Sequence, residues 1–301
     1  MKPIAQMSTV MLIIMSLFIS QSLQATTNYC SNGTVRHFIG AEFGHLDQAK
    51  LDTAMPAQVE FTTTELNSAW VLAREQQHSR SIGFNFQYTN VNLESIDAMT
   101  NGHLHTWDFP FEGRLSNTGS ELFYDITPAI SVSSNALKNP ELIDADGLQL
   151  NLGMVFKKNI SLDSAWLAGL RSDYRFGPYR AYPVVGVCLH PARDWDLQLA
   201  FPDFSVLKRF NRGISLKLFA EPVGNQWHVF SKDLTQESDF GYNAIAVGLS
   251  AQWHISASIN VGLVIENQTN RHLRFVLEDN TFIDVKADSS TGMVLKGEVL
   301  F

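Results

Sequence analysis

The sequence predicts an all-β protein, a transmembrane antiparallel up-and-down β-barrel of about twelve strands, with a range of about ten to fourteen. Apolar and polar residues alternate in segment after segment, as in strands with one apolar face. The segments are roughly 9 to 13 residues long, which matches a tilted bilayer crossing and exceeds the usual globular strand. Their connections alternate between long and short, as in outer-membrane barrels.

The first 25 residues predict a signal peptide. One cation, Lys2, precedes an apolar run from Val10 to Ile19 and a polar stretch that ends at Ala25. The run is only about half of the roughly 20 residues that a membrane-spanning helix needs. We therefore expect removal of residues 1–25, with cleavage after Ala25, and export to the outer membrane.

The barrel is expected over residues 81–301. Clear alternation occurs, for example, from Leu148 to Phe156 and from Ile245 to Trp253. The expected strands are 81–92, 104–114, 120–132, 147–157, 164–174, 181–190, 194–202, 212–222, 226–232, 242–255, 257–267 and 290–301.

Residues 26–80 contain irregular strand-like segments at Val35–Phe43, Gln58–Thr63 and Ala69–Arg74. They predict either an extra strand pair, which would raise the count to about fourteen, or an amino-terminal segment that enters the lumen or stays periplasmic. Twelve strands is the preferred interpretation.

A periplasmic carboxyl terminus sets the orientation of an even-stranded barrel. The long connections at Leu93–His103, Ser133–Asp146, Ser231–Gly241 and Gln268–Ser289 are then extracellular. Gly224–Asn225 and Ser256 are expected as periplasmic turns. Within the last long connection, Leu273 to Leu277 and Phe282 to Val285 predict a projecting strand pair.

A soluble periplasmic β-sandwich is the alternative fold, because its strands also have one apolar face. Tryptophans near strand ends favour the membrane, where aromatic girdles lie at the two interfaces; these are Trp166, Trp195, Trp227 and Trp253. No apolar run in the mature chain approaches about 18 residues, which excludes helical membrane spans.

The last strand carries an expected assembly signal. Met293, Leu295, Val299 and Phe301 alternate with polar positions and end in an aromatic residue. This pattern resembles the terminal strand of proteins that are delivered to the outer-membrane assembly machinery, which is therefore an expected partner along with outer-membrane lipid and lipopolysaccharide.

The stretch from Tyr174 to Val229 resembles a family of outer-membrane β-barrels known only as a domain of unknown function, DUF 6268. The similar features are the strand around Pro183, the segment DWDLQLAFP from Asp194 to Pro202, and the Glu221-Pro222 pair before Trp227. The resemblance covers about the carboxyl-terminal two thirds of the chain. It implies fold and location, and no activity.

Charges of both signs occupy the strand parity expected to face the lumen, because Arg or Lys facing lipid at mid-depth costs about 2–4 kcal/mol. The candidates are Asp108, Glu112, Arg114, Glu121, Asp125, Arg171, Asp173, Asp196, Lys217, Glu221, Glu266, Lys296 and Glu298. They predict either a structural network of paired charges that fills the lumen or a narrow, porin-like channel.

Two cysteines, Cys30 and Cys188, could form a disulfide in an exported protein or remain as two unpaired thiols. A lipid-modifying enzyme is the alternative function, with His78, Ser79 and Ser81 as nearest candidates. Adjacent strand residues point to opposite faces, however, so we expect no enzyme. His103 and His105 share a face but are too few to hold a metal.

No cofactor is expected. The net charge of −8 becomes about −9 without Lys2, which argues against nucleic acid as a partner. The sequence thus predicts a monomeric outer-membrane barrel with a structural or transport role.

Overall fold

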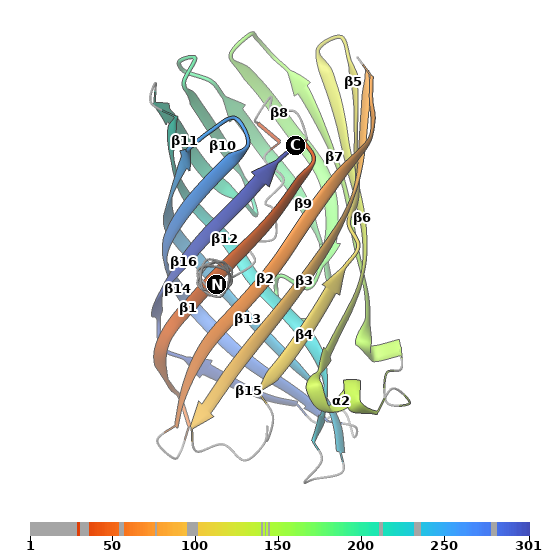
Figure 1. Cartoon of the computed structure of the whole chain (residues 1–301), viewed down its shortest axis with the longest axis vertical. Helices are drawn as coiled ribbons and strands as arrows, with labels where there is room; N and C mark the ends of the chain where they lie inside the picture. Colours follow the sequence, from red (N-terminus) through yellow and green to blue (C-terminus); the bar gives the residue numbers. More distant parts are fainter. Residues whose placement is uncertain are drawn as a thin grey trace, which may run out of the picture.

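A computed structural model describes residues 29–30, 36–53, 57–75, 77–94, 102–139, 141, 143, 145–210, 213–231, 236–277 and 282–301. The expected signal peptide, residues 1–25, lies outside this range. The described chain is a closed antiparallel β-barrel (Figure 1).

Fourteen strands form the ring, with β4 and β5 counted as one strand that is interrupted at Phe109-Pro110. The ring closes where β1 pairs with β16 from Phe38↔Leu300 to Leu46↔Gly292. The strands in order are β1 (Phe38–Leu51), β2 (Ala57–Arg74), β3 (His78–Glu94), β4 (His103–Asp108) with β5 (Phe111–Asn117), β6 (Ser120–Ser133), β7 (Leu148–Asn159), β8 (Ser164–Asp173), β9 (Arg180–Leu189), β10 (Trp195–Phe201), β11 (Phe204–Phe210), β12 (Ile214–Ser231), β13 (Gln236–His254), β14 (Ile259–Leu277) and β16 (Ser290–Leu300).

The count is at the upper end of the expected range, because the irregular amino-terminal segments are β1 and β2 of the wall. The preferred count of twelve also misses β11, whose Phe204–Phe210 segment carries Lys208 on its outer face.

The expected periplasmic turn at Gly224–Asn225 is wrong. Both residues continue β12 and pair with Asn243 and Tyr242 of β13, so the strands expected at 212–222 and 226–232 are one strand. A glycine is required here because an added Cβ at Gly224 would lie 2.7 Å from the Arg175 carbonyl oxygen. Gly224 therefore marks a close approach between chain segments rather than a turn.

The two faces of the wall differ in chemistry. Large apolar side chains on the outer face are exposed, such as Leu249 at 48% and Leu295 at 45%. The next residues on the same strands point inward and are polar or small, as for Ser250 and Lys296. The protein therefore presents an apolar belt to its surroundings and a polar lining to the interior of the part that contains Ser250 and Lys296.

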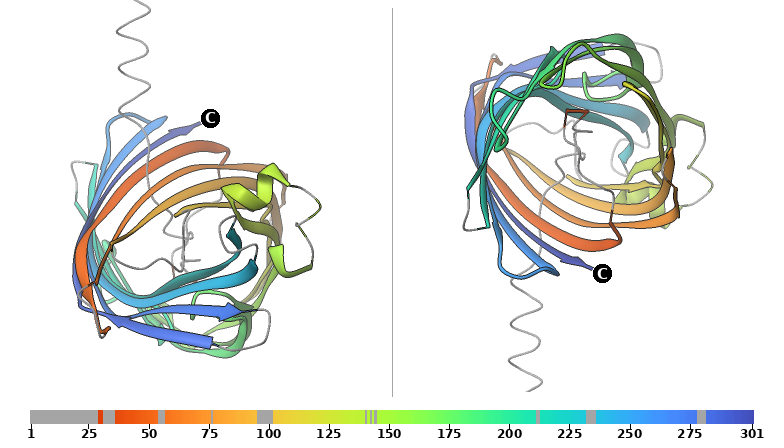
Figure 2. Two further views of the ribbon diagram at one scale, coloured as in Figure 1. Left: turned by 90° about the horizontal axis from the view of Figure 1, so that it is seen from below. Right: turned by 90° about the horizontal axis from the view of Figure 1, so that it is seen from above.

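The barrel has a wide and a narrow end (Figure 2). The wide end carries Phe38 and Phe301, and all fourteen strands reach it. At the narrow end, strands β7 to β11 have ended and β12 meets β6 directly at His228↔Val132. Strand β15 (Phe282–Ala287) takes the place of β16 there, so nine strands enclose this end. Fewer strands enclose a narrower lumen, so this end is the constricted one.

Contacts at the narrow end fix the meeting of β12 and β6. The Phe230 N–H donates to the Ser133 hydroxyl at 3.2 Å, and the Asn135 amide donates to the Phe230 carbonyl at 3.2 Å. Asn135 lies in the short helix α2 (Ser134–Lys138), followed by the 3-10 turn η2 (Ala145–Gly147). No helix within the described ranges is long and apolar enough to cross a membrane.

The projecting strand pair expected between Gln268 and Ser289 is confirmed. β14 extends to Leu277, and β15 (Phe282–Ala287) pairs with it from Arg271↔Ala287 to Val276↔Phe282. The β15 strand also contacts β1 at Leu51↔Ala287 and so fills the ring beyond the end of β16.

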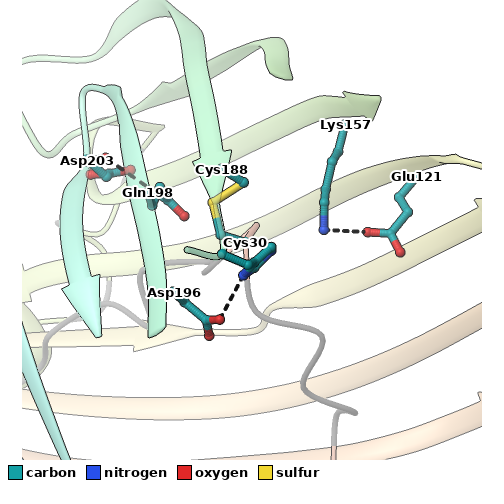
Figure 3. The surroundings of a disulfide bond; sticks show 8 residues. Cys30, Glu121, Lys157, Cys188, Asp196, Gln198 and Asp203 are labelled. Carbon is teal, nitrogen blue, oxygen red and sulfur yellow. Dashed lines mark hydrogen bonds and ion pairs between the residues drawn. A yellow bond between two sulfur atoms is a disulfide. The ribbon is translucent and has the colours of Figure 1, made fainter. Parts of the chain in front are cut away.

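Cys30 and Cys188 form a disulfide that holds Tyr29 and Cys30 inside the lumen (Figure 3). Cys188 is an inward residue of β9, and Tyr29 and Cys30 are buried against Val155 and Leu167. The chain thus uses both arrangements considered for residues 26–80: a strand pair in the wall and, at Tyr29–Cys30, a segment within the lumen.

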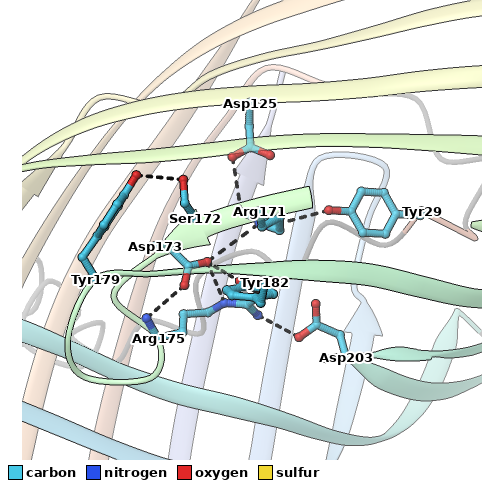
Figure 4. A network of polar contacts seen from close by, with 9 residues as sticks. All are labelled: Tyr29, Asp125, Arg171, Ser172, Asp173, Arg175, Tyr179, Tyr182 and Asp203. Carbon is cyan, nitrogen blue, oxygen red and sulfur yellow. Dashed lines mark hydrogen bonds and ion pairs between the residues drawn. The ribbon is translucent and has the colours of Figure 1, made fainter. Parts of the chain in front are cut away.

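Two short hairpins, β8–β9 and β10–β11, end before the narrow end, and Arg175 joins their tips (Figure 4). Its guanidinium donates to Asp203 at 2.7 Å in one tip and to Asp173 at 3.1 Å in the other. All three side chains are at most 6% exposed. Arg171 extends this network to Asp125 at 3.3 Å and to the Tyr29 hydroxyl at 3.2 Å.

We expect Arg175→Met to lower the free energy of unfolding by about 3–5 kcal/mol, because it leaves Asp173 and Asp203 buried without their cation. Lys208→Met is the matched control. It breaks the more exposed ion pair with Asp194, which is expected to contribute at most about 1 kcal/mol. Urea unfolding in lipid vesicles, followed by tryptophan fluorescence, measures both. Equal small effects would contradict a stabilising role for Arg175.

Candidate functional site: the lumen

The lumen contains two cavities in series followed by an apolar cluster. Consecutive inward residues of a strand pass from one layer to the next: on β2, Glu65 lines the larger cavity, Thr63 the smaller cavity, and Val59 belongs to the apolar cluster. β12 shows the same order with Lys217, Glu221 and Val229. The inner face therefore changes from charged to apolar along the barrel axis.

The larger cavity lies in the wide half and has a volume of about 360 Å³. Its lining includes Glu42 of β1 and Lys296 of β16, which form an ion pair of 2.7 Å across the seam of the barrel. Glu298 accepts a hydrogen bond from Asn260 at 3.2 Å. The cavity is thus a charged compartment that can bind polar solutes.

The smaller cavity, of about 100 Å³, is lined mainly by neutral polar side chains. The Asn225 amide donates to the Thr106 hydroxyl at 3.1 Å, and the Trp227 indole N–H donates to the same oxygen at 3.0 Å. The expectation that Trp227 belongs to an outer aromatic girdle is therefore wrong. Because β12 is continuous, its parity directs Trp227 inward, where it is 4% exposed.

The apolar cluster fills the narrow end. It contains inward residues of eight strands, among them Leu46, Phe61, Val91, Leu104, Trp227, Phe240, Leu273 and Val285. The rings of Phe61 on β2 and Tyr242 on β13 meet across the lumen with centroids 4.6 Å apart, and Phe240 stacks on Trp227 at 5.8 Å. Among the residues that the structure describes, the side chains of this cluster obstruct the lumen at the narrow end.

The thirteen charged residues singled out from the sequence all lie on β4, β5, β6, β8, β10, β12, β14 or β16. Seven belong to ion pairs of the wall: Arg114 with Glu121, Arg171 with Asp125 and Asp173, Asp196 with Arg209 and His190, and Lys296 with Glu42.

The other six have different surroundings. Asp108 and Glu221 line the smaller cavity, and Lys217 and Glu298 line the larger one. Glu112 pairs in register with Asp125, and Glu266 accepts a hydrogen bond from Gln268 at 2.6 Å. Of these six, four therefore line a cavity and two contact neighbouring residues of the wall.

Sequence reasoning missed several lumen residues. Glu42 and Glu65 lie on strands that were treated as irregular, although their alternation with Phe43 and Leu66 would have revealed them. Lys157 lies 3.2 Å from Glu121. It is on the inward face of the expected strand at 147–157, so the alternation of that strand could have identified it. Arg175 lies in a hairpin tip, where strand periodicity carries no information.

The remaining candidates lie outside the lumen or form no site. Met293, Leu295, Val299 and Phe301 are exposed on the outer face of β16, and their role in assembly stays a prediction. His78 pairs with Glu75 at 2.9 Å, and no described contact joins it to Ser79 or Ser81. His103 and His105 stack on Tyr88 and Trp107. Within the described ranges, no group of three His, Cys, Asp or Glu residues could hold a metal ion.

Comparison with solved structures finds outer-membrane barrels. The COG4313 outer membrane channel from Pseudomonas putida F1 aligns with a TM-score of 0.53 and 10% identity over 92% of this chain and 100% of that chain. The TodX monoaromatic hydrocarbon channel deltaS2 mutant gives a TM-score of 0.49 and 9% identity, covering 92% of each chain. The Pseudomonas putida toluene transporter TodX gives 0.40 and 7%, covering 94% and 95%. At this identity the first likeness shows the fold alone.

Comparison with curated proteins finds no match. A family model does match residues 124–282, more than half of the chain, and this range includes the segment from Tyr174 to Val229 on which the sequence resemblance rests. The closed barrel agrees with the fold which that resemblance implies. The chain belongs to the family described as Domain of unknown function (DUF6268).

Proposed function

We propose that the protein is an integral outer-membrane channel for small polar solutes, monomeric and held in the bilayer by its apolar outer face. The membrane location is supported by that face, where leucine, isoleucine and phenylalanine side chains are exposed over many strands. Lys208 lies 4.7 Å from the Trp195 ring at the wide end, an arrangement typical of a membrane interface. Its hydrogen bond lowers the pKa of the Asp194 carboxyl in the adjacent turn.

The bilayer contact is tested by Leu249→Arg. Leu249 lies on the outer face of β13 between Leu218 and Ile265, so an arginine there would lie in hydrocarbon. We expect the free energy of unfolding in phospholipid vesicles to fall by about 2–4 kcal/mol. Ser256→Arg, in the turn at the wide end, is the control and is expected to cost at most about 1 kcal/mol. If Leu249→Arg left the free energy of unfolding unchanged and the protein were found in the water-soluble fraction, the result would instead support a soluble fold.

The series of two cavities within one polar-lined lumen is the observation that carries the channel proposal. A purely structural network would have its charges paired and its interior filled, as small barrels often do. Within the described ranges, the wide half has both ion pairs and open volume, and the side chains of the apolar cluster obstruct the narrow half. Movement of these side chains would therefore widen the path between the two sides of the membrane.

The gate is tested by the double substitution Phe61→Ala and Phe240→Ala. We expect the unchanged protein to pass little current in planar bilayers and the variant to give larger single-channel steps, because two rings that obstruct the lumen are removed. Phe84→Ala with Phe156→Ala, on the outer face, is the matched control and should behave like the unchanged protein. Heat-modifiable gel migration verifies folding. Absence of current in a folded gate variant would overturn the channel proposal.

An enzymatic role has less support. The lipid-hydrolase candidates require a nucleophile and a base in contact, whereas Ser81 is buried on the inward side of β3 and His78 pairs with Glu75. The structural neighbours are described as channels and a transporter. We propose that the protein binds its solute and lets it pass through the barrel, without catalysing a reaction.

A further inference from the structure

The larger cavity holds three charged residues whose described contacts include no ion pair: Glu65, Glu298 and Lys217. It is lined by Glu42, Glu65, Glu298, Lys217 and Lys296. Glu42 and Lys296 form an ion pair with each other at 2.7 Å. The other charges of this cavity decide what it can bind.

Glu65 is a buried carboxylate, 3% exposed, that faces the cavity from β2. Its Oε1 accepts a hydrogen bond of 3.4 Å from the Asn67 amide, while its Oε2 is buried with no hydrogen-bond partner. No described cation lies within ion-pair distance of it. A carboxyl group buried in this way ionises only at a cost in free energy, which a ligand with a positive charge would reduce.

Lys217 enters the same cavity from β12. Its ammonium lies 5.5 Å from the Phe219 ring on its own strand, and none of the described carboxylates lies within ion-pair distance. Glu298, the remaining acid of the cavity, has the Asn260 amide as its hydrogen-bond donor. The cavity therefore offers a carboxyl group at Glu65 that can bind a cationic group, and an ammonium at Lys217 that can bind an anionic group.

We propose that this cavity binds a small zwitterionic solute of the α-amino acid class, with its ammonium at Glu65 and its carboxylate at Lys217. A simple cation would leave Lys217 uncompensated, and a simple anion would face the carboxylates of Glu65 and Glu298. The volume of about 360 Å³ is within the range of ligand pockets, about 300–1,000 Å³. The proposal rests on the proposed function in that it names the substrate class of the same lumen.

Three probes that differ by one charged group test it: L-serine, ethanolamine, which lacks the carboxylate, and glycerate, which lacks the ammonium. Isothermal titration calorimetry on the detergent-solubilised full barrel measures binding without requiring passage. We expect saturable binding of L-serine, and binding of ethanolamine and glycerate weaker by about tenfold or more, because each loses one charge-assisted contact.

Two substitutions test which residue binds the ammonium of the solute and which binds its carboxylate. Glu65→Gln and Lys217→Met should each weaken L-serine binding by about tenfold or more. Glu65→Gln should also remove the preference for L-serine over glycerate, a change that a purely structural role would not produce. Glu112→Gln, a lumen carboxyl outside this cavity, and Lys158→Met, an exposed residue of β7, are the controls and should bind normally.

No binding of L-serine, or equal binding of ethanolamine and L-serine, would overturn the zwitterion proposal. Because the gate variant is judged by conductance and this site by equilibrium binding, the two proposals can fail separately. Current through the gate variant without L-serine binding would overturn the zwitterion proposal and leave a channel with another selectivity. L-serine binding without current would overturn the channel proposal and leave a barrel that binds the solute but does not conduct.

Discussion

Closure of the hydrogen-bonded ring at the β1–β16 seam is the constraint on which the rest of the structure depends. A bilayer offers no water to unpaired backbone groups, so a sheet within it must have no open edge. The seam brings the first wall strand against the last, with nine residue pairs from Phe38↔Leu300 to Leu46↔Gly292. It also places Glu42 beside Lys296, so the closure of the wall creates one side of the larger cavity.

The same constraint explains the shape of the lumen. Strands β7 to β11 stop before the narrow end, and contact of β12 with β6 closes the gap that they leave in the ring. This change in strand number reduces the diameter and brings inward side chains of facing strands into contact. The apolar cluster is therefore a result of the wall topology as much as of side-chain choice: the rings of Phe61 and Tyr242 meet because their strands converge there.

Buried charges in this lumen have two roles. The network of Arg171 and Arg175 with Asp125, Asp173 and Asp203 is nearly saturated by its own contacts and joins β6 and the two hairpin tips to the tethered amino-terminal residues. Such a network favours rigidity of the wall. Around Glu65 and Lys217 the pairing is incomplete and open volume remains, which is the arrangement expected where a solute has to bind and leave.

The sequence by itself determined the barrel, its approximate strand number, most strand positions and the parity of polar residues, because alternation with period two is a local property that each strand carries alone. It left open the Cys30–Cys188 disulfide, and it misplaced Gly224–Asn225 and Trp227, since a turn-like dipeptide can lie in a continuous strand. Only the tertiary structure decided which charges meet, where the lumen closes and where Glu65 and Lys217 face one cavity. Those outcomes depend on strand ends and on contacts between facing walls, which are far apart in sequence and have no periodic signal.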